Sequence, residues 1–419
     1  MKTKFDNYFF FYLLVLFTFS VLFLYKKHAI GNDSTISEWL INYSGGFTKR
    51  GIIGQICIFV ADFFKVNLRD IILIFQIKII GVYFFLLFRL FKNITVNKLI
   101  ILSIFSPIFI LYPVAEIEVL ARKEIFIFCI FIFYLFIETI FLKRLYKIFV
   151  LSISILIWEP VIFFFLFFIA IDIIKERIEQ FDKKFFLNLI YFLPAVTLAF
   201  YTALTPLSIE GHEKMAQILK NNFDENCYMS CALLKTKSGI LDQFKGNFHK
   251  YSLEVFVRYF MIIVFGFAPL IILMSNSRAQ YENLIFFKNF KKLLLPCMLL
   301  LSPIILLFAM GYDWGRWVNI GYFFCVTFYF YLLKSKEIVL EEKLMDNKFY
   351  KVLENKKIFL FIFVIFCFGW NPKTVISADV ATNPLWKIPY NASKQIFGFD
   401  SFRIFQDSPI SIWHKKYIE

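Results

Sequence analysis

Long apolar runs dominate this chain, and they leave few folds open to it. A helix that crosses a bilayer needs about 20 mostly apolar residues. Stretches near that length recur at roughly 8–25, 70–92, 99–113, 125–142, 148–171, 186–205, 253–274, 293–310, 319–333 and 358–370. The mean hydropathy of +0.68 is far above that of soluble domains. The sequence therefore predicts an all-α, polytopic integral membrane protein.

The segment 148–171 decides the predicted topology. Read as one helix, it buries Glu159 at the bilayer centre and leaves the lysine-rich loop 334–357 outside. Read as two arms of about 12 residues that meet at Trp158-Glu159-Pro160, it brings Glu159 to the outer surface. Because the residue before a proline avoids helical geometry, we favour the break.

The two-arm interpretation also satisfies the positive-inside rule. The basic segments then all face the cytoplasm, namely 143–147, 172–185, 275–292 and 334–357. We expect about 11 crossings in a single transmembrane domain spanning 1–419, with the N-terminus cytoplasmic and 52–66 as a short re-entrant or interfacial helix. The large outer loop 206–252 is expected to be helical from about 208 to 222, and 371–419 forms an outer tail.

The net charge of +15 comes from basic residues that lie mostly in short runs beside apolar stretches. That pattern sets membrane orientation and favours contact with anionic lipid headgroups, so the lipid bilayer is a predicted partner. No nucleic-acid motif is present, and nucleic acid is excluded as a partner.

Two of the seven cysteines, Cys227 and Cys231, share a polar loop. An extracytoplasmic loop would allow a disulfide between them, but the sequence leaves open whether it forms. No metal site is predicted there, because no neighbouring His or Cys completes a ligand set. His212, beside Glu210 and Glu213, is interpreted as part of a solvated loop face.

Four polar clusters interrupt the apolar pattern, and the topology places all four at the outer face. The first runs from Gly45 to Gly51 and contains Lys49 and Arg50. Glycines let backbone N–H groups approach a ligand, and the basic pair favours phosphate. The P-loop spacing is absent, so no nucleotide site is predicted. The alternative is a flexible turn with cations at the membrane interface.

The second cluster is Arg122-Lys123-Glu124, and the third is Trp158-Glu159-Pro160, which contributes a carboxylate alone. Arg122 and Lys123 precede an apolar helix, where helix N-termini attract anions; the alternative is ordinary interfacial charge. Glu159 lies between two apolar arms, whose limited solvation is expected to raise its pKa and make it a general base. The alternative is a turn in which Glu159 merely faces water.

The fourth cluster, Tyr312 to Trp317, holds an Asp and an Arg three residues apart. If the segment is helical, Asp313 and Arg316 share a face and form an ion pair. Trp314 and Trp317 are candidates for stacking on sugar rings. The alternative is an aromatic belt with a structural ion pair. Arg258, near the outer end of its segment, is a weaker phosphate candidate.

With those residues in view, the chain resembles the O-antigen and capsular polysaccharide repeat-unit polymerases of bacteria, within the wider set of polyprenyl-dependent membrane glycosyltransferases. The resemblance rests on the architecture and on the clusters Gly45 to Gly51 and Asp313 to Trp317. It implies a multi-pass enzyme of the bacterial inner membrane, with a polyprenyl pyrophosphate-linked oligosaccharide as substrate and a chain-length regulator protein as a partner. It also implies a carboxylate early in the first outer loop, at Asp33 or Glu38.

The expected reaction moves a growing glycan from its lipid pyrophosphate to a hydroxyl of the next lipid-linked repeat unit. The predicted general base is Glu159, or else Asp313. The predicted pyrophosphate ligands are Lys49, Arg50, Arg122, Lys123 and Arg316. No cofactor or metal ligand set is evident, although a divalent cation bridging carboxylate and phosphate is an alternative. Two other functions stay open: a single-sugar polyprenyl-phosphate-dependent transferase, and a flippase for the same lipid-linked oligosaccharide.

Overall fold

The computed structural model describes residues 2–30, 34–235, 240–248, 251–288, 290–341, 344 and 348–376. Nearly all regular structure in these residues is helical, as predicted. The all-α prediction missed one short antiparallel pair, β1 (Ser277–Ala279) with β2 (Ile338–Leu340). The chain packs as two compact units, each built from distant segments: unit 1 is Met1–Phe19, Leu90–Glu116 and Ile240–Glu419, and unit 2 is Ser20–Arg89 and Ile117–Gly239.

Three helices in the described residues are long and apolar enough to cross a membrane: α1 (Lys2–Ile30), α4 (Leu68–Phe91) and α17 (Leu253–Ser275). A fourth candidate is the pair α12 (Lys183–Ile190) and α13 (Leu193–Leu204), bent by 45°. Pro194 at the start of α13 explains this break, because it cannot continue the hydrogen-bond ladder of a preceding helix. The eleven crossings stay a prediction.

Unit 2 contains the predicted break at Trp158. A continuous helical stretch made of α9 (Ile140–Leu145), the π-helical turn η1 (Tyr146–Val150) and α10 (Leu151–Ile157) ends there, because Trp158 has extended backbone angles. The 3₁₀ segment η2 (Glu159–Phe164) and α11 (Phe165–Lys175) follow. The arms are longer than expected, since helix already begins at Ile140 and continues to Lys175.

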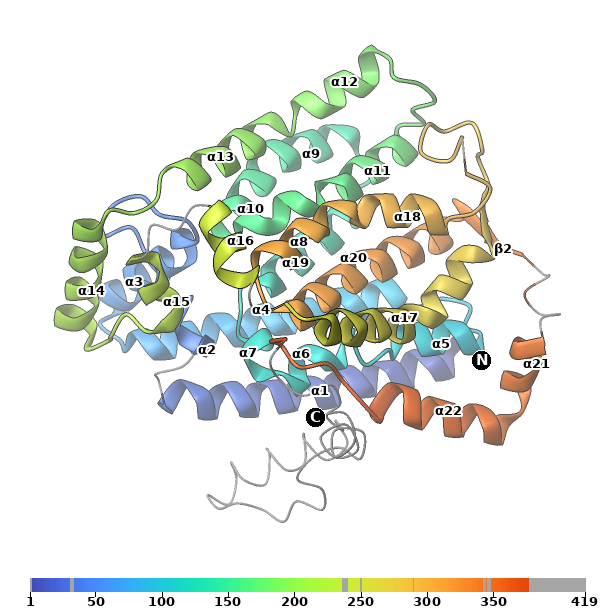
Figure 1. The fold of residues 1–419 in the computed structure, drawn as a ribbon, viewed down its shortest axis with the longest axis horizontal. Helices are drawn as coiled ribbons and strands as arrows, with labels where there is room; N and C mark the ends of the chain where they lie inside the picture. Colours follow the sequence, from blue (N-terminus) through green and yellow to red (C-terminus); the bar gives the residue numbers. More distant parts are fainter. Residues whose placement is uncertain are drawn as a thin grey trace. The chain divides into compact units, whose positions relative to one another are not determined.

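The two arms form a hairpin (Figure 1), as ion pairs at their open end demonstrate. Lys147 Nζ lies 2.7 Å from Asp172 Oδ2, although a straight helix would separate these residues by about 37 Å. Lys143 also contacts Asp172, and all three side chains are buried. Tyr134, from α8 (Glu124–Phe136), donates a hydrogen bond to the same carboxylate. The predicted break and the pairing of the two arms are confirmed, whereas their crossing of the membrane stays a prediction.

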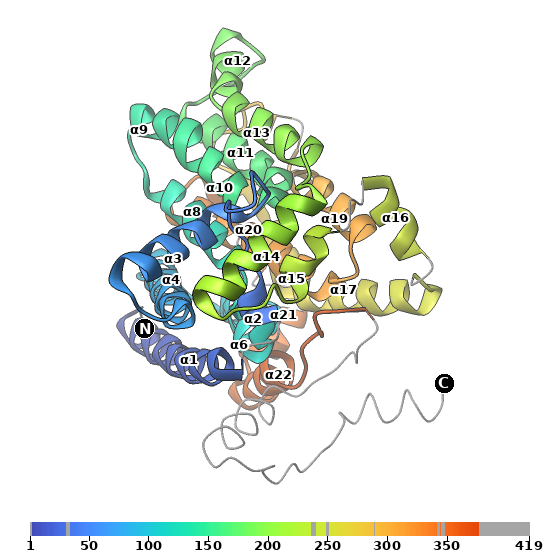
Figure 2. The ribbon, with the colours of Figure 1, turned by 90° about the vertical axis from the view of Figure 1, so that its left-hand side faces the viewer.

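The other helices of unit 2 pack on one another and on this hairpin. The short helix α2 (Ser34–Ser37) lies against α7 (Ile117–Leu120) and α15 (Met229–Ala232). Helix α3 (Gly51–Phe64) packs on α10. The predicted helix near 208–222 is α14 (Ile209–Phe223), which lies with α15 beside α2 in Figure 2. The 3₁₀ turn η3 (Leu233–Lys235) follows α15.

Unit 1 is organised around α20 (Trp314–Lys334), which is buried along nearly its whole length. It packs against α17, α18 (Leu294–Leu301) and α19 (Ile305–Met310), and the 3₁₀ turn η4 (Ser302–Ile304) joins the last two. The unit also contains the first part of α1 and the helices α5 (Lys98–Ile104), α6 (Leu111–Ala115), α16 (Ile240–Phe248), α21 (Lys348–Glu354) and α22 (Lys356–Phe368).

Polar side chains of unit 1 satisfy an unwound stretch inside the predicted segment 99–113. Helix α5 stops at Ile104, and Asn319 of α20 donates to the carbonyl oxygens of Ile108 and Phe109 at 2.8 and 3.1 Å. Ser106 Oγ donates to Gly266 O at 2.9 Å. Backbone groups that leave the helical hydrogen-bond pattern in apolar surroundings need such partners, because a buried group without one is costly.

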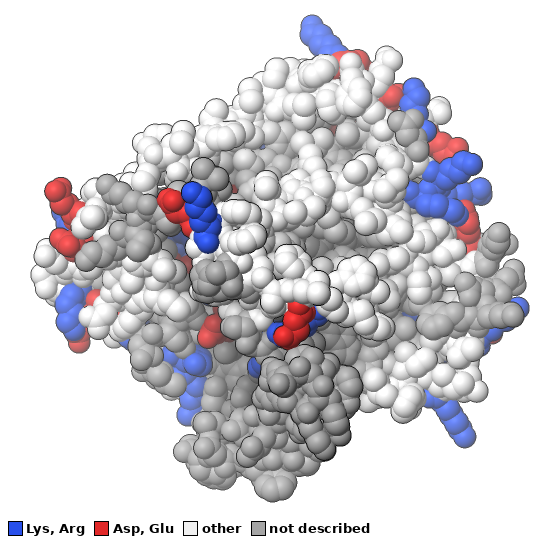
Figure 3. Space-filling view, in the orientation of Figure 1, with Lys and Arg blue, Asp and Glu red and all other residues white. Residues whose placement is uncertain are grey.

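Exposed apolar side chains cover helices in both units. On α13 they are Leu193, Phe200, Tyr201 and Leu204, and on α18 and α19 they are Leu295, Met298, Leu299, Ile305 and Leu306. The surface over α13 shows little charge in the space-filling view (Figure 3). An apolar surface of this kind on a soluble monomer would promote aggregation, whereas hydrocarbon accommodates it.

Candidate functional site

Five of the predicted site residues come together in unit 2, with Arg50 at their centre. Arg50 Nε and Nη2 donate to the two oxygens of Glu159 at 2.8 and 2.9 Å. Its Nη1 donates to Glu38 Oε1 at 2.8 Å. Lys49 Nζ lies 3.9 Å from Glu159, and Arg122 Nη1 lies 3.8 Å from Glu38. We call Glu38, Lys49, Arg50, Arg122, Lys123, Glu124 and Glu159 the Arg50 cluster.

The backbone holds Arg50 in a conformation that side-chain-bearing residues rarely adopt. Its φ of 62° is in the left-handed region, directly before the first residue of α3. Lys123 Nζ donates to Arg50 O at 2.6 Å. The next residue, Gly51, has no room for a side chain, because a Cβ there would lie 2.3 Å from the Tyr43 ring. Strained residues of this kind concentrate at functional sites, where surrounding contacts fix them.

A second set of contacts places Glu38 beside Arg122. Trp39 Nε1 and Gln76 Nε2 both donate to the carbonyl oxygen of Ala121, the residue before Arg122. Gln76 Nε2 also donates to Thr35 O at 2.8 Å. Helix α4 therefore ties the segment that carries Glu38 to the start of α8.

The cluster holds four cations against three carboxylates, a formal charge of +1. Its exposure is graded: Glu38 and Lys123 are 0% exposed, Arg50 and Glu159 are 22% and 23% exposed, and Lys49 is 39% exposed. Arg122 is also buried, and among the described residues no acceptor contacts its Nε. An anion entering on the Lys49 side would therefore meet a buried cation with a hydrogen-bond donor to offer.

The expected rise in the pKa of Glu159 is wrong. Burial does favour the neutral acid, but the charges of Arg50 and Lys49 and the Arg50 hydrogen bonds outweigh it, so the pKa is lowered below its usual value. Burial lowers the pKa of Lys123 to about 8, because the attraction of Glu38 offsets only part of the desolvation cost. The pKa of Arg50 is raised, since Glu159 and Glu38 outweigh burial.

Glu38 is the cluster member that no local motif marked. It follows a four-residue helix and precedes a buried tryptophan, a setting typical of many loop carboxylates. Only the family resemblance pointed to it, as an alternative to Asp33, which lies outside the described residues.

The remaining predicted site residues belong to unit 1. Asp313 and Arg316 form the predicted ion pair at the start of α20, and the Arg316 guanidinium lies over the Trp317 ring. Trp314 is only 4% exposed and is packed by four aromatic rings, those of Tyr251, Phe256, Tyr259 and Phe308. This packing is that of a core aromatic, and it favours the structural alternative for Trp314.

The described start of the C-terminal tail, residues 371–376, lies against the same helix end. Thr374 O accepts from Gly315 N at 3.1 Å, and Ile376 N donates to Tyr312 O at 3.0 Å. A Cβ at Gly315 would lie 1.9 Å from Lys373 O, which explains the glycine. Arg258 donates to Ile376 O at 3.0 Å and pairs with Glu254, so its contacts hold this segment.

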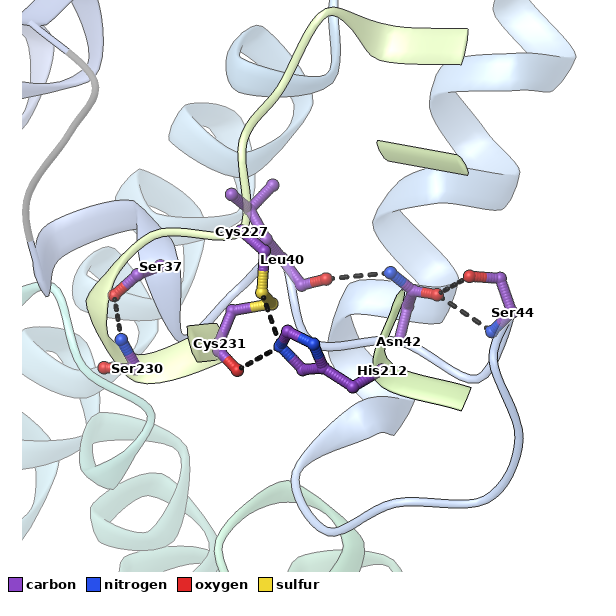
Figure 4. Close-up of a disulfide and its surroundings, with 8 residues drawn as sticks. All are labelled: Ser37, Leu40, Asn42, Ser44, His212, Cys227, Ser230 and Cys231. Carbon is purple, nitrogen blue, oxygen red and sulfur yellow. Dashed lines mark hydrogen bonds between the residues drawn. A yellow bond between two sulfur atoms is a disulfide. The ribbon is translucent and has the colours of Figure 1, made fainter. Parts of the chain in front are cut away.

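The disulfide that the sequence left open is present between Cys227 and Cys231 (Figure 4). His212 was placed wrongly, because it is buried rather than on a solvated face. Its Nε2 lies 3.2 Å from Cys227 Sγ and 3.2 Å from Cys231 O. The argument that no nearby histidine completes a metal site is therefore wrong. His212, Cys227 and Cys231 each offer one donor atom, and these atoms lie within 4.8 Å of one another. The closed disulfide keeps both sulfurs from acting as thiolate ligands.

Comparisons of this chain with protein families, with curated proteins and with solved structures find no match.

Proposed function

We propose that this chain is a multi-pass protein of the bacterial inner membrane that polymerises lipid-linked oligosaccharide repeat units. The Arg50 cluster is its reaction centre, with Lys49, Arg50, Arg122 and Lys123 binding the pyrophosphate of the donor. The observation that carries the proposal is Arg50 itself: one strained arginine bridges Glu38 and Glu159, beside a buried Arg122 whose Nε has no acceptor among the described residues.

The reaction needs a leaving-group site and a base, and the cluster contains both types of group. The acceptor hydroxyl oxygen forms a bond to the anomeric carbon of the donor glycan, and the bond from that carbon to the pyrophosphate oxygen breaks. The lipid pyrophosphate leaves with the bonding electrons, and the cations stabilise its charge. The hydroxyl proton passes to a carboxylate, for which Glu159 and Glu38 are the candidates.

Pyrophosphate binding would itself activate the base. Arg50 and Lys49 hold the pKa of Glu159 low. A pyrophosphate carries more charge than a carboxylate and competes for the same guanidinium. When Arg50 turns to the pyrophosphate, Glu159 loses its main stabilising contact, and its pKa rises towards the value that base catalysis requires.

Complementation of a gene deletion in the native host tests the proposal. The deletion is expected to leave single capped repeat units and to remove long glycan chains. Arg50→Ala and Glu159→Gln are each expected to reproduce that pattern at unchanged protein level. The matched control is Lys65→Gln, which removes an exposed cation from the other end of α3 and is expected to restore the full ladder. Arg316→Ala reports whether the pair in unit 1 also serves the reaction.

The glycan pattern separates the alternatives. A normal ladder with both Arg50→Ala and Glu159→Gln contradicts the proposed site. Loss of all surface glycan in the deletion indicates a flippase or an earlier transferase. A repeat unit that lacks one sugar indicates a single-sugar transferase.

Cysteine labelling tests the proposed orientation. A cysteine at the exposed position Glu210, in the 206–252 loop, is expected to react with an impermeant reagent added outside. A cysteine at the exposed position Glu179, beyond the open end of the hairpin, is expected to react only after the membrane is permeabilised. The reverse pattern contradicts the proposed topology.

A further inference from the structure

The disulfide and His212 form a small structure that none of the proposed chemistry uses. The Cys227–Cys231 bond closes the turn between α14 and α15, and His212 of α14 contacts both ends of it (Figure 4). Cys231 is fully buried, whereas Cys227 is partly exposed. We call His212, Cys227 and Cys231 the clasp.

The clasp touches the segment that carries Glu38. Ser230, inside the disulfide loop, donates its backbone N–H to Ser37 Oγ at 3.2 Å. Ser37 is fully buried, and the next residue is Glu38. Helix α15 lies along α2, so the position of the disulfide loop sets the position of the residues that precede Glu38.

The clasp also touches the segment that leads to Arg50. Gly211, next to His212, packs so closely on Gly45 that a Cβ at Gly45 would lie 1.8 Å from Gly211 O. Asn42 fixes the intervening turn, because its side chain donates to Leu40 O and accepts from Ser44 N, both at 2.9 Å. Tyr43 N donates to Gln55 Oε1 of α3 at 3.0 Å.

We propose that the clasp positions Glu38 and Arg50 relative to each other, so that reducing the disulfide loosens the Arg50 cluster and lowers glycosyl transfer. This inference rests on the proposed function. The salt bridge of Arg69 with Glu225 and its hydrogen bond to Tyr228 hold the same turn to α4. Reduction is therefore expected to lower kcat several-fold without abolishing glycosyl transfer.

The chemistry of opening is ordinary thiol–disulfide exchange with a dithiol reductant. A thiolate of the reductant attacks the accessible Cys227 sulfur, the S–S bond breaks, and Cys231 leaves as a thiolate that takes up a proton. The second thiol of the reductant then releases Cys227 and closes its own disulfide. The reductant is oxidised by two electrons, and both cysteines end as thiols.

Hydrogen exchange of the full-length protein in detergent or nanodiscs tests the clasp without reference to activity. Dithiothreitol is expected to speed exchange over residues 36–50, and reoxidation is expected to reverse it. The Cys227→Ser/Cys231→Ser variant is expected to show the faster exchange with or without dithiothreitol. The internal control is α17, in unit 1, whose exchange is expected to stay the same. Unchanged exchange over 36–50 on reduction overturns the proposal.

Transfer assays with the same samples test the positioning role. Reduction is expected to lower kcat several-fold with a smaller change in KM, and reoxidation is expected to restore kcat. The double serine variant is expected to have the lower kcat in both conditions. Faster exchange over 36–50 with unaltered kcat overturns the positioning claim. If the oxidised wild type catalyses no transfer, the proposed function fails, and the exchange measurement alone decides whether the clasp holds this segment.

Discussion

Arg50 and Glu159 are 109 residues apart in the sequence, and the guanidinium of one binds both carboxylate oxygens of the other. The contact joins the N-terminal end of α3 to the apex of the α10–α11 hairpin. Two polar clusters that the sequence presents as separate features are therefore one site. Because Arg50 also binds Glu38, a single cation connects three segments of unit 2.

Replacing Arg50 is expected to destabilise the protein as well as inactivate it. Arg50→Met removes the cation that both Glu38 and Glu159 bind. Glu38 is fully buried, and removing the ion-pair partner of a buried charge costs about 3–5 kcal/mol. Adding Glu38→Gln is expected to recover part of that loss, because the most deeply buried charge is then absent. Thermal unfolding in detergent measures both effects.

The control for that comparison is Lys65→Met, which breaks an exposed pair with Asp62. Exposed pairs contribute about 0–1 kcal/mol, so little change in unfolding temperature is expected. Equal stabilities for Arg50→Met with and without Glu38→Gln would show that Glu38 does not depend on Arg50.

Lys123 is expected to make pyrophosphate binding sensitive to pH. Its pKa of about 8 means that its charge is lost as the pH rises through 8, which weakens the attraction for an anion. Between pH 8 and the ordinary lysine range, the unfolded chain binds a proton that the folded chain does not, so this residue makes the free energy of unfolding rise with pH. Calorimetric titration with inorganic pyrophosphate from pH 6.5 to 9.5 measures the binding.

Lys123→Arg is the matched variant, because arginine keeps its charge across this range. The affinity of the wild type is expected to fall relative to that of Lys123→Arg above pH 8. Pyrophosphate gains charge with pH equally for both proteins, so the ratio of affinities isolates Lys123. A constant ratio across the range contradicts the role of Lys123.

The sequence allowed much of this arrangement to be predicted, for identifiable reasons. Trp158-Glu159-Pro160 interrupts an apolar stretch, and basic residues lie at the far ends of both arms, in 143–147 and 172–185, so helix propensity and charge distribution both predicted the hairpin. Arg50 lies among glycines beside a second cation, a local pattern that is readable without any structure. Asp313 and Arg316 are near enough in sequence for their pairing to follow from helix geometry alone.

The predictions that were wrong or missing concern residues whose surroundings come from distant parts of the sequence. The pKa of Glu159 was predicted from burial, and its sign changed because Arg50 comes from 109 residues away. Glu38 has no local signal, since its importance comes from Arg50 and Arg122. His212 was interpreted from its charged neighbours, although its surroundings are set by a disulfide 15 or more residues further on.

Asp172 is expected to be essential for the hairpin. Its carboxylate contacts both Lys147 and Lys143 at the open end of the hairpin, and all three side chains are buried. Asp172→Asn removes the charge that offsets the two lysines, which is expected to cost about 3–5 kcal/mol and to lower the yield of folded protein. The control is Glu179→Gln, an exposed carboxylate beyond the hairpin, which is expected to change stability little. Similar fluorescence-detected melting curves for both variants would contradict a structural role for this ion pair.

The approach of Gly45 to Gly211 is expected to tolerate no side chain. A Cβ at Gly45 would lie 1.8 Å from Gly211 O, so Gly45→Ala must push α14 away from the turn that leads to Arg50. We expect Gly45→Ala to lower the unfolding temperature and to reduce glycan chain length together, because it displaces both the clasp and the Arg50 cluster.

Gly246→Ala is the matched control: Gly246 lies in α16, and a Cβ there would meet nothing within 4 Å. Alanine at position 246 is expected to be neutral or slightly stabilising, since it favours helix over glycine by about 1 kcal/mol. Wild-type glycan ladders and melting temperatures for Gly45→Ala would contradict the close packing from which the positioning role of α14 is argued.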